Sequence, residues 1–150
     1  MLLLGGIIHE VENNITTKLM AKNNTEAPEK DIVSFNQALG LCSIGFDEPT
    51  FCMYEIENKQ LCLCHLDEDG LYKPDKDFHA PTKSQVFRWF REKYKMQSYL
   101  TEFLEMCSNN DGTYHVVVGG TWYPQLDSKD YEKAENALID KLIELVKEKK

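Results

Sequence analysis

The stretch Pro81-Thr-Lys-Ser-Gln-Val-Phe-Arg-Trp-Phe-Arg-Glu-Lys-Tyr-Lys95 carries the clearest local signal in the chain. Thr82 followed by Gln85 is a capping box, in which each side chain accepts a hydrogen bond from the other residue's free backbone N–H. Apolar side chains then recur at helical spacing, at Val86, Phe87, Phe90 and Tyr94. The stretch therefore predicts a helix that begins after Thr82 and divides the chain into two similar halves.

Ordered structure is expected to begin near Ser34. This serine forms a second capping box with Gln37, and Gly45 suits the left-handed C-terminal end of a short helix between them. The residues before it end in a polar stretch without periodicity. We therefore interpret residues 1–31 as a flexible leader and residues 32–150 as the folded α+β domain.

The first helix is followed by a predicted β-hairpin. Two strand-like runs, residues 51–57 and 60–66, are separated by Asn58-Lys59. If that pair forms the turn, Glu55 lies opposite Cys62 in the ladder. The charged segment between this hairpin and the central helix is expected to be a loop.

The half after the central helix repeats this order. Residues 97–107 and 113–119 predict a longer hairpin around the turn signal Ser108-Asn-Asn-Asp-Gly112. A last helix is expected from about Lys129 to Glu148, with Ser128 as its cap. The sequence thus predicts an α+β protein in the order helix, hairpin, helix, hairpin, helix, with the helices packed on antiparallel sheet.

Two questions of organisation stay open at this level. Each hairpin follows a helix that a capping box opens, so a weak internal duplication is one interpretation. One domain and two abutting units, residues 32–78 and 79–150, fit the pattern equally well. The apolar face of the last helix suits either a single-molecule core or a dimer, so the oligomeric state is not predicted.

Composition and charge narrow the classes of function. The 150 residues carry a net charge of −8, which disfavours loose binding to nucleic acid or anionic lipid. The apolar residues 1–8 follow no basic residue and fall short of the ~20 that a membrane helix needs. An odd number of cysteines without disulfide-framework spacing predicts reduced thiols in a cytoplasm: Cys42, Cys52, Cys62, Cys64 and Cys107.

The nearest approach to a metal motif is Cys62-Leu-Cys64-His65. Zinc needs about four thiolate or imidazole ligands that converge. The predicted hairpin directs His65 to the face opposite the two thiols, so we expect small, partly buried side chains and no metal or cofactor. A small metal-dependent enzyme that adds His115 to this set remains an alternative, although no spacing links these residues.

The central helix is the candidate binding surface. Residues 83–95 contain five Lys or Arg and one Glu, an excess of +4 in an acidic chain. Tryptophan beside arginine is typical of protein interfaces, and basic residues on one helix face can follow phosphates. The candidate site is therefore Arg88, Trp89, Arg91 and Lys95, with a protein as the expected partner and nucleic acid as the alternative. A core helix with a solvated basic side explains the same residues.

Two blocks of sequence carry a family resemblance. The run Ala80-Pro-Thr-Lys-Ser-Gln-Val-Phe-Arg-Trp-Phe-Arg-Glu-Lys-Tyr94 and the run Tyr131-Glu-Lys-Ala-Glu-Asn-Ala-Leu-Ile-Asp-Lys-Leu-Ile-Glu-Leu-Val-Lys147 resemble segments of small uncharacterised proteins encoded by phages and prophages of gut anaerobic bacteria. The resemblance covers most of residues 33–148 and transfers no catalytic residue. It implies a non-enzymatic accessory protein of a mobile element that binds a host or phage protein inside a bacterial cell.

Overall fold

The computed structural model describes residues 29–63, 78–102 and 111–149, and two of its helices begin where the capping boxes predict. Helix α2 (Phe35–Ile44) is capped by Ser34, whose Oγ accepts from the Gln37 N–H while the Gln37 amide oxygen accepts from the Ser34 N–H. Helix α3 (Lys83–Tyr94) has the same reciprocal pair between Thr82 and Gln85. Both capping boxes are confirmed, and the prediction that Gly45 ends α2 in the left-handed region is confirmed at φ 88°.

Helix α4 (Tyr131–Glu148) begins two residues later than predicted. Its cap is Asp130, whose carboxylate accepts from the Lys133 N–H at 3.1 Å, and not Ser128. The Ser128 hydroxyl instead accepts from the Asp130 N–H at 3.0 Å, in the turn that precedes the helix. The apolar residues Tyr131, Ala134, Leu138, Leu142 and Leu145 predict the core face of this helix. Ala134, Leu138 and Leu142 are buried as predicted, whereas Tyr131 is 51% exposed.

The first sheet has the strand order β2-β1-β3, formed by β1 (Cys52–Tyr54), β2 (Leu61–Leu63) and β3 (Phe78–Ala80). The β1–β2 hairpin was predicted, but its register differs by two residues: Met53, and not Glu55, pairs with Cys62. The loop has four residues, since the Glu55 N–H donates to the Gln60 carbonyl across residues 56–59. A shift of two residues keeps each side chain on its predicted face.

The second sheet has the order β4-β5-β6, formed by β4 (Ser98–Thr101), β5 (His115–Val118) and β6 (Thr121–Trp122). The predicted antiparallel pairing between the segments 97–107 and 113–119 is confirmed, while most of the predicted turn lies outside the described residues. Gly119 and Gly120, with φ 59° and 80°, end β5 and form a two-residue turn into β6. The two sheets differ in strand order, so the internal repeat does not extend to sheet topology.

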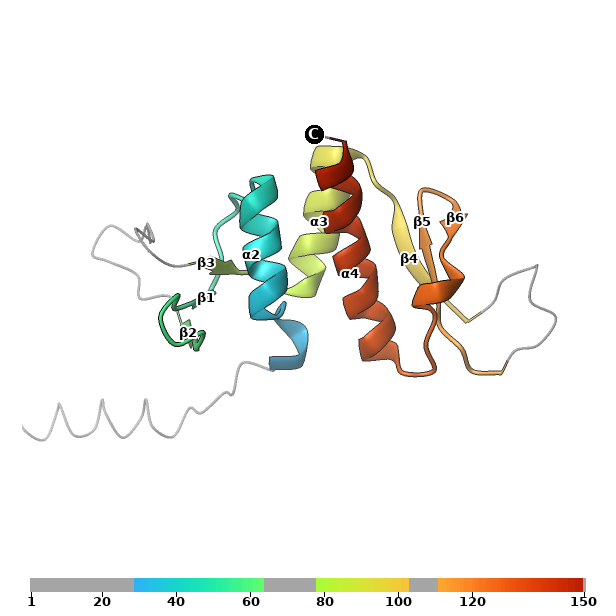
Figure 1. The fold of residues 1–150 in the computed structure, drawn as a ribbon, viewed down its shortest axis with the longest axis horizontal. Helices are drawn as coiled ribbons and strands as arrows, with labels where there is room; N and C mark the ends of the chain where they lie inside the picture. The colour runs from blue at the N-terminus through green and yellow to red at the C-terminus, as the bar shows by residue number, and fades with distance from the viewer. Residues whose placement is uncertain (1–28, 64–77, 103–110, 150) are drawn as a thin grey trace, which may run out of the picture.

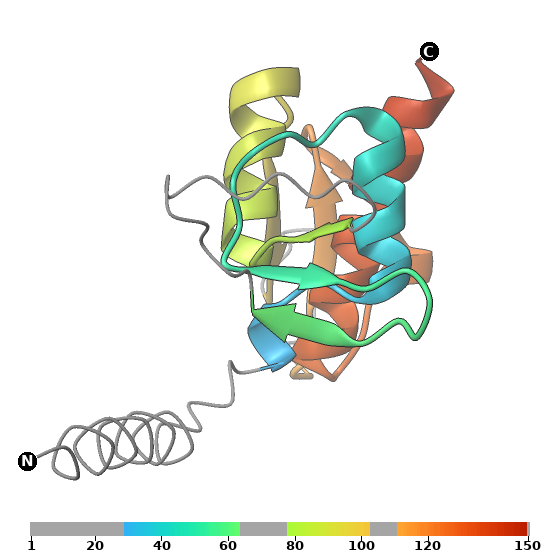
Figure 2. The same cartoon turned by 90° about the vertical axis from the view of Figure 1, so that its left-hand side faces the viewer.

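The described elements form three layers, with the helices between the two sheets (Figure 1). The three helices run in the same direction, as the colour gradient shows in both views (Figures 1 and 2). Helix α2 contacts β3 on one side and α4 on the other, and α4 packs on β5. One hydrophobic cluster joins all three helices with β5, and it includes Leu41, Val86, Phe90, Val116 and Leu142. Residues from both proposed units, 32–78 and 79–150, therefore share one core.

Helices α2 and α4 approach closely because small and polar residues permit it. A Cβ at Gly40 would lie 3.2 Å from the Ile143 side chain, which is tighter than ordinary contact, so Ile143 would have to move by a few tenths of an ångström to admit one. The buried Gln37 amide donates to the Asn136 carbonyl at 3.1 Å and to an Asp140 carboxylate oxygen at 3.0 Å. The residue that caps α2 thus also fixes α2 against α4.

The chain before α2 is described from Glu29. A short 3-10 turn, Glu29–Asp31, occupies the last residues assigned to the flexible leader, and residues 1–28 lie outside the description. Ile32 pairs with Thr82 in an isolated β-bridge, and the Val33 N–H donates to the Pro81 carbonyl at 3.1 Å. None of the described helices has the length and apolar character that a membrane span requires.

Candidate functional site

Trp89, the main residue of the predicted contact surface, is buried, and this corrects its assignment. It is 3% exposed and packs on Phe46, with ring centroids 5.2 Å apart, and on Phe90 and Tyr94 of its own helix. Its position continues the spacing of Val86 and Phe90, so it belongs to the apolar face of α3. Trp89 stabilises the contact between α3 and the end of α2 and cannot touch a partner.

Of the three basic residues in the predicted surface, Arg88 is held by an ion pair with a carboxylate, and the neighbouring Lys93 is held as well. Arg88 lies 2.8 Å from Glu48, which holds the pKa of the guanidinium above its usual value. Lys93 donates to the Gly45 carbonyl at 2.8 Å and lies over the Trp89 ring. Lys95 follows the helix in the left-handed region, at φ 56°, so it does not continue the face of Arg88 and Arg91.

Lys83, one of the five basic residues of the segment 83–95, is buried. Its ammonium lies 3.1 Å from the Glu135 carboxylate of α4, and both side chains are largely shielded from water. Breaking such a pair by removing one partner is strongly destabilising, because it leaves an uncompensated charge. The Lys83–Glu135 pair therefore joins α3 to α4 and contributes nothing to the exposed positive charge.

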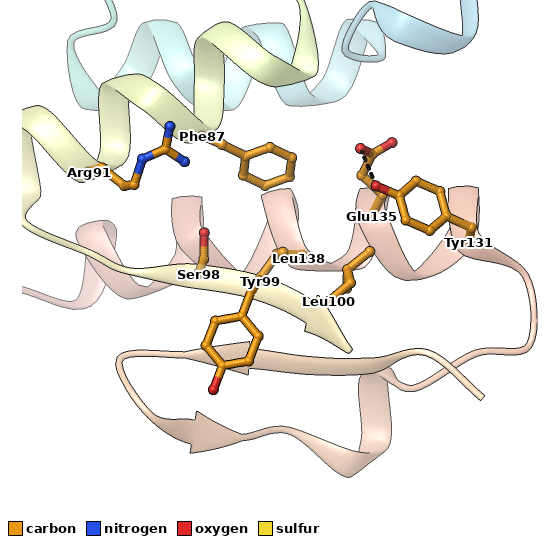
Figure 3. A pocket seen from close by; sticks show the side chains of 8 residues that line it. All are labelled: Phe87, Arg91, Ser98, Tyr99, Leu100, Tyr131, Glu135 and Leu138. Atoms are coloured by element: carbon orange, nitrogen blue, oxygen red, sulfur yellow. Dashed lines mark hydrogen bonds between the residues drawn. The ribbon is translucent and has the colours of Figure 1, made fainter. Parts of the chain in front are cut away.

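Arg91 is different, because it is exposed and has no ion pair among the described residues. It lies at a cavity of about 190 Å³ between α3, β4 and α4, which we name the Arg91 cavity (Figure 3). The lining residues come from all three elements: Phe87, Arg91, Ser98, Tyr99, Leu100, Tyr131, Glu135 and Leu138. A guanidinium that presents five N–H donors and no acceptor is thus available at the edge of a concave surface.

The opposite wall of the Arg91 cavity holds an unsatisfied hydroxyl. Ser98 Oγ is buried and has no hydrogen-bond partner within the described parts of the chain. In Figure 3 this hydroxyl, from β4, is turned toward the side of the cavity from which Arg91 extends. A buried polar group without a partner costs about 1–3 kcal/mol, so this serine favours the arrival of a polar ligand.

The far end of the Arg91 cavity is formed by α4. The Tyr131 hydroxyl donates to Glu135 at 3.4 Å, one helical turn along the same face (Figure 3). Burial, with the nearby Glu135 charge, raises the pKa of Tyr131 above its usual value, although half of the side chain is exposed. Glu135 therefore forms an ion pair with Lys83 and accepts a hydrogen bond from Tyr131, and its charge is largely compensated within the protein.

The candidate metal motif receives no support from the residues that the structure describes. Cys62 lies near Glu55, with its sulfur 3.4 Å from a carboxylate oxygen, while Cys64 and His65 lie outside the described residues. Within the described ranges, no three Cys, His, Asp or Glu side chains gather as metal ligands would. Burial raises the pKa of the Cys52 thiol, which disfavours a thiolate nucleophile there.

His115 belongs to a second polar group, the Asp127 cluster, formed by His115, Val116, Trp122 and Asp127. A carboxylate can only accept, so His115 Nδ1 donates to Asp127 at 2.7 Å. Asp127 also accepts from the Val116 N–H at 3.0 Å and from Trp122 Nε1 at 3.0 Å. These bonds fix the turn η2 (Pro124–Leu126) against β5, and the cluster lines none of the described cavities. We therefore interpret it as structural.

A small cavity of about 30 Å³ holds the remaining pairing of cysteine and histidine, Cys42 and His79. His79 Nδ1 lies 3.1 Å from the Thr50 hydroxyl, and burial lowers the pKa of the imidazole. The cavity has the volume of about one water molecule. It is too small for a substrate, and no contact joins the Cys42 sulfur to the imidazole.

Of the four candidate site residues, Arg91 lines a cavity among the described residues, whereas Trp89 lies in the core. Sequence reasoning missed Ser98 and Glu135. The i, i+4 spacing of Tyr131 and Glu135 could have indicated a shared face, but nothing in the sequence placed that face beside Arg91. No family model matches the chain, and neither a curated protein nor a solved structure matches it.

Proposed function

We propose that this chain is a non-enzymatic protein-binding protein, an accessory factor of a phage or integrated element that acts in the cytoplasm of its bacterial host. Its partner is a host or phage protein, and the contact is centred on the Arg91 cavity. The phage context rests on the resemblance of the segments 80–94 and 131–147. The contact surface rests on the structure.

One observation carries the proposal: Arg91 lies at the edge of a small cavity and forms no ion pair with any residue that the structure describes. Arginine at a partly apolar pocket is a common centre of protein interfaces, because its planar head and its aliphatic stem can both contact a partner. Phe87, Leu100 and Leu138 supply the apolar walls. At about 190 Å³ the cavity is smaller than the ~300–1,000 Å³ typical of small-molecule and cofactor sites, so it suits one side chain of a larger partner.

The alternative of nucleic-acid binding by residues 83–95 has less support. Lys83, Arg88 and Lys93 each lie within 4.0 Å of a carboxylate. Arg91 and Lys95 are then the cations of this segment that pair with no carboxylate in the described ranges. A protein that follows a nucleic-acid backbone needs several unpaired cations, each neutralising a phosphate. Because the net charge is also −8, the surface is a poor track for phosphates.

The alternative of a small Cys/His enzyme also has less support. The chemistry requires a nucleophile or metal ligands that converge in a cavity large enough for a substrate. In the described parts of the chain, the Arg91 cavity contains neither cysteine nor histidine, and His115 points its Nδ1 at a structural carboxylate.

The test is a pull-down of the tagged chain from a bacterial host lysate, with and without nuclease and at low and moderate salt. We expect a stoichiometric protein that survives nuclease and salt, identified by mass spectrometry. Arg91→Ala should release it. Arg88→Ala is the matched control, since Arg88 is also exposed, lies on the same helix and is already held by Glu48.

Two outcomes would contradict the proposal. Co-purified nucleic acid that is lost as salt rises would assign the helix to phosphate binding. Capture of the same protein by wild type and Arg91→Ala, with loss in Arg88→Ala, would place the contact on the Glu48 side of α3 and away from the cavity.

A further inference from the structure

We infer that the Arg91 cavity recognises the carboxylate of an aspartate or glutamate side chain that lies between apolar residues on the partner protein. This inference rests on the proposed function and specifies the chemistry that the partner presents. Four features of the cavity lead to it.

The first feature is the donor at the cavity edge. The Arg91 guanidinium is planar and matches a carboxylate through two parallel N–H···O bonds, which a lysine ammonium cannot form. It is exposed and has no ion pair in the described ranges, so no internal bond is broken when it turns toward a ligand. A neutral or positive side chain would leave these donors unpaired.

The second feature is the Ser98 hydroxyl, a buried donor that no described residue satisfies. An incoming carboxylate has two oxygens and about four acceptor positions, enough for the guanidinium and the hydroxyl together. The hydroxyl becomes accessible only when a side chain of the cavity wall moves. Arg91 is free to move, because no described residue holds it.

The third feature is that Glu135, the acidic group of the cavity, does not repel the ligand as a free carboxylate would. Its charge is compensated by Lys83 at 3.1 Å, and Tyr131 donates to it. One unpaired cation and one compensated anion favour a ligand with a single negative charge. A phosphoryl group, which carries nearly two charges at neutral pH, normally needs a cluster of arginines.

The fourth feature is the apolar surface around these polar groups. Phe87, Leu100 and Leu138 line the same cavity, and they gain most when they contact methylene groups or a neighbouring apolar side chain. The charge of −8 on the whole chain repels an acidic partner at long range, so recognition depends on the short-range fork of Arg91. An acidic residue flanked by apolar ones meets both conditions.

The test uses two blocked tripeptides, acetyl-Leu-Glu-Leu-amide and its neutral isostere acetyl-Leu-Gln-Leu-amide, titrated into the isotope-labelled full chain. Binding is followed by the NMR shifts of the β4 amides, including Ser98 and Leu100. We expect the glutamate peptide to bind at least about tenfold more tightly than the glutamine peptide, the size of one charge-assisted hydrogen bond. Arg91→Gln should abolish this difference, Ser98→Ala should reduce it, and Arg88→Gln should preserve it.

Equal affinity for the two peptides would overturn the inference, as would binding of neither or a preference that survives Arg91→Gln. These results are distinguishable from failure of the proposed function. If the pull-down still yields a nuclease-resistant protein that depends on Arg91, the binding role stands while the carboxylate assignment fails. If the glutamate peptide binds as expected and the pull-down yields nothing, the cavity chemistry stands without a cellular partner.

Discussion

Replacement of Asp127 by alanine tests whether one carboxylate holds the second sheet together. The substitution removes the acceptor of three donors: the His115 imidazole at 2.7 Å, the Val116 N–H at 3.0 Å and the Trp122 indole N–H at 3.0 Å. The His115 ring is also T-stacked on Trp122, with centroids 5.7 Å apart. Loss of Asp127 therefore leaves several buried polar groups unpaired at once.

The magnitude follows from burial. Hydrogen bonds to a charged acceptor contribute about 1.5–3 kcal/mol each, but they are not additive within one cluster. The Asp127 side chain is 12% exposed and that of His115 is 8% exposed, so water can replace only part of what is lost. We expect the free energy of unfolding to fall by about 3 kcal/mol, a large share of the ~5–15 kcal/mol of a typical domain.

Urea unfolding followed by far-UV circular dichroism measures this change. Tryptophan fluorescence gives a second reading, because Trp122 donates to Asp127 directly and should change its emission in the folded state. Asp111→Ala is the matched control: Asp111 is an exposed aspartate whose carboxylate lies 3.5 Å from the Lys129 ammonium. Equal losses for the two variants would refute the assignment of Asp127 as a structural centre, and Asp127→Asn should fall between wild type and Asp127→Ala.

Three further predictions concern other parts of the core. Trp89→Ala should lower the free energy of unfolding by about 3–5 kcal/mol, measured by urea unfolding, because it leaves a cavity beside Phe46; a stable variant that has lost only binding would show that Trp89 is a surface residue after all. Lys83→Met should cost about 3 kcal/mol by removing the ion-pair partner of Glu135, and thermal melting should show that the double variant Lys83→Met/Glu135→Leu recovers most of that loss. Burial lowers the pKa of His79, so the folded chain binds this proton less readily than the unfolded chain does. Stability should therefore fall as pH drops below the ordinary histidine value of ~6.5 toward the lowered pKa. His79→Asn should reduce that slope in urea midpoints measured across this range, and an unchanged slope would exclude His79 as its source.

Local signals in the sequence predicted the helices well. Ser34 with Gln37 and Thr82 with Gln85 are complete capping boxes in four residues, and the structure forms both. The predicted start of the last helix was wrong by two residues because Ser128 and Asp130 are both good caps, and only the turn before α4 decides between them. A signal contained within one helical turn was therefore sufficient to predict where α2 and α3 begin.

Non-local pairing was harder to predict. The predicted register of β1 and β2 was wrong by two residues, because the sequence indicated a tight turn at Asn58-Lys59. The loop instead spans residues 56–59, with Lys59 at φ 58°. Strands β3 and β6 were not predicted, because each is short and lies beside a charged or glycine-rich segment that is typical of a loop. Their existence depends on the neighbouring strand that they complete.

The candidate site was predicted only in part for the same reason. Arg91 was named from its helix, but its role depends on β4 and α4, which the sequence could not place beside it. The prediction that Trp89 is a surface residue was wrong because it rested on the arginines beside it. The spacing of Trp89 from Val86 and Phe90 already indicated the core face. Helical periodicity would have been the better guide than composition.

The parallel arrangement of the three helices has a consequence for the order in which the chain can fold. Each helix is joined to the next through strands, and α4, the last element in sequence, packs against α2, α3 and both β4 and β5. In a nascent chain that has left the ribosome only as far as Asp130, the side chains of Leu41, Val86 and Phe90 lack the α4 residues that share their core in the folded protein. Its native core requires contacts between residues far apart in sequence, which form slowly because loop closure precedes them. Until α4 emerges, the apolar surfaces that it covers stay exposed, so the shared core forms only after α4 (Tyr131–Glu148) has been made.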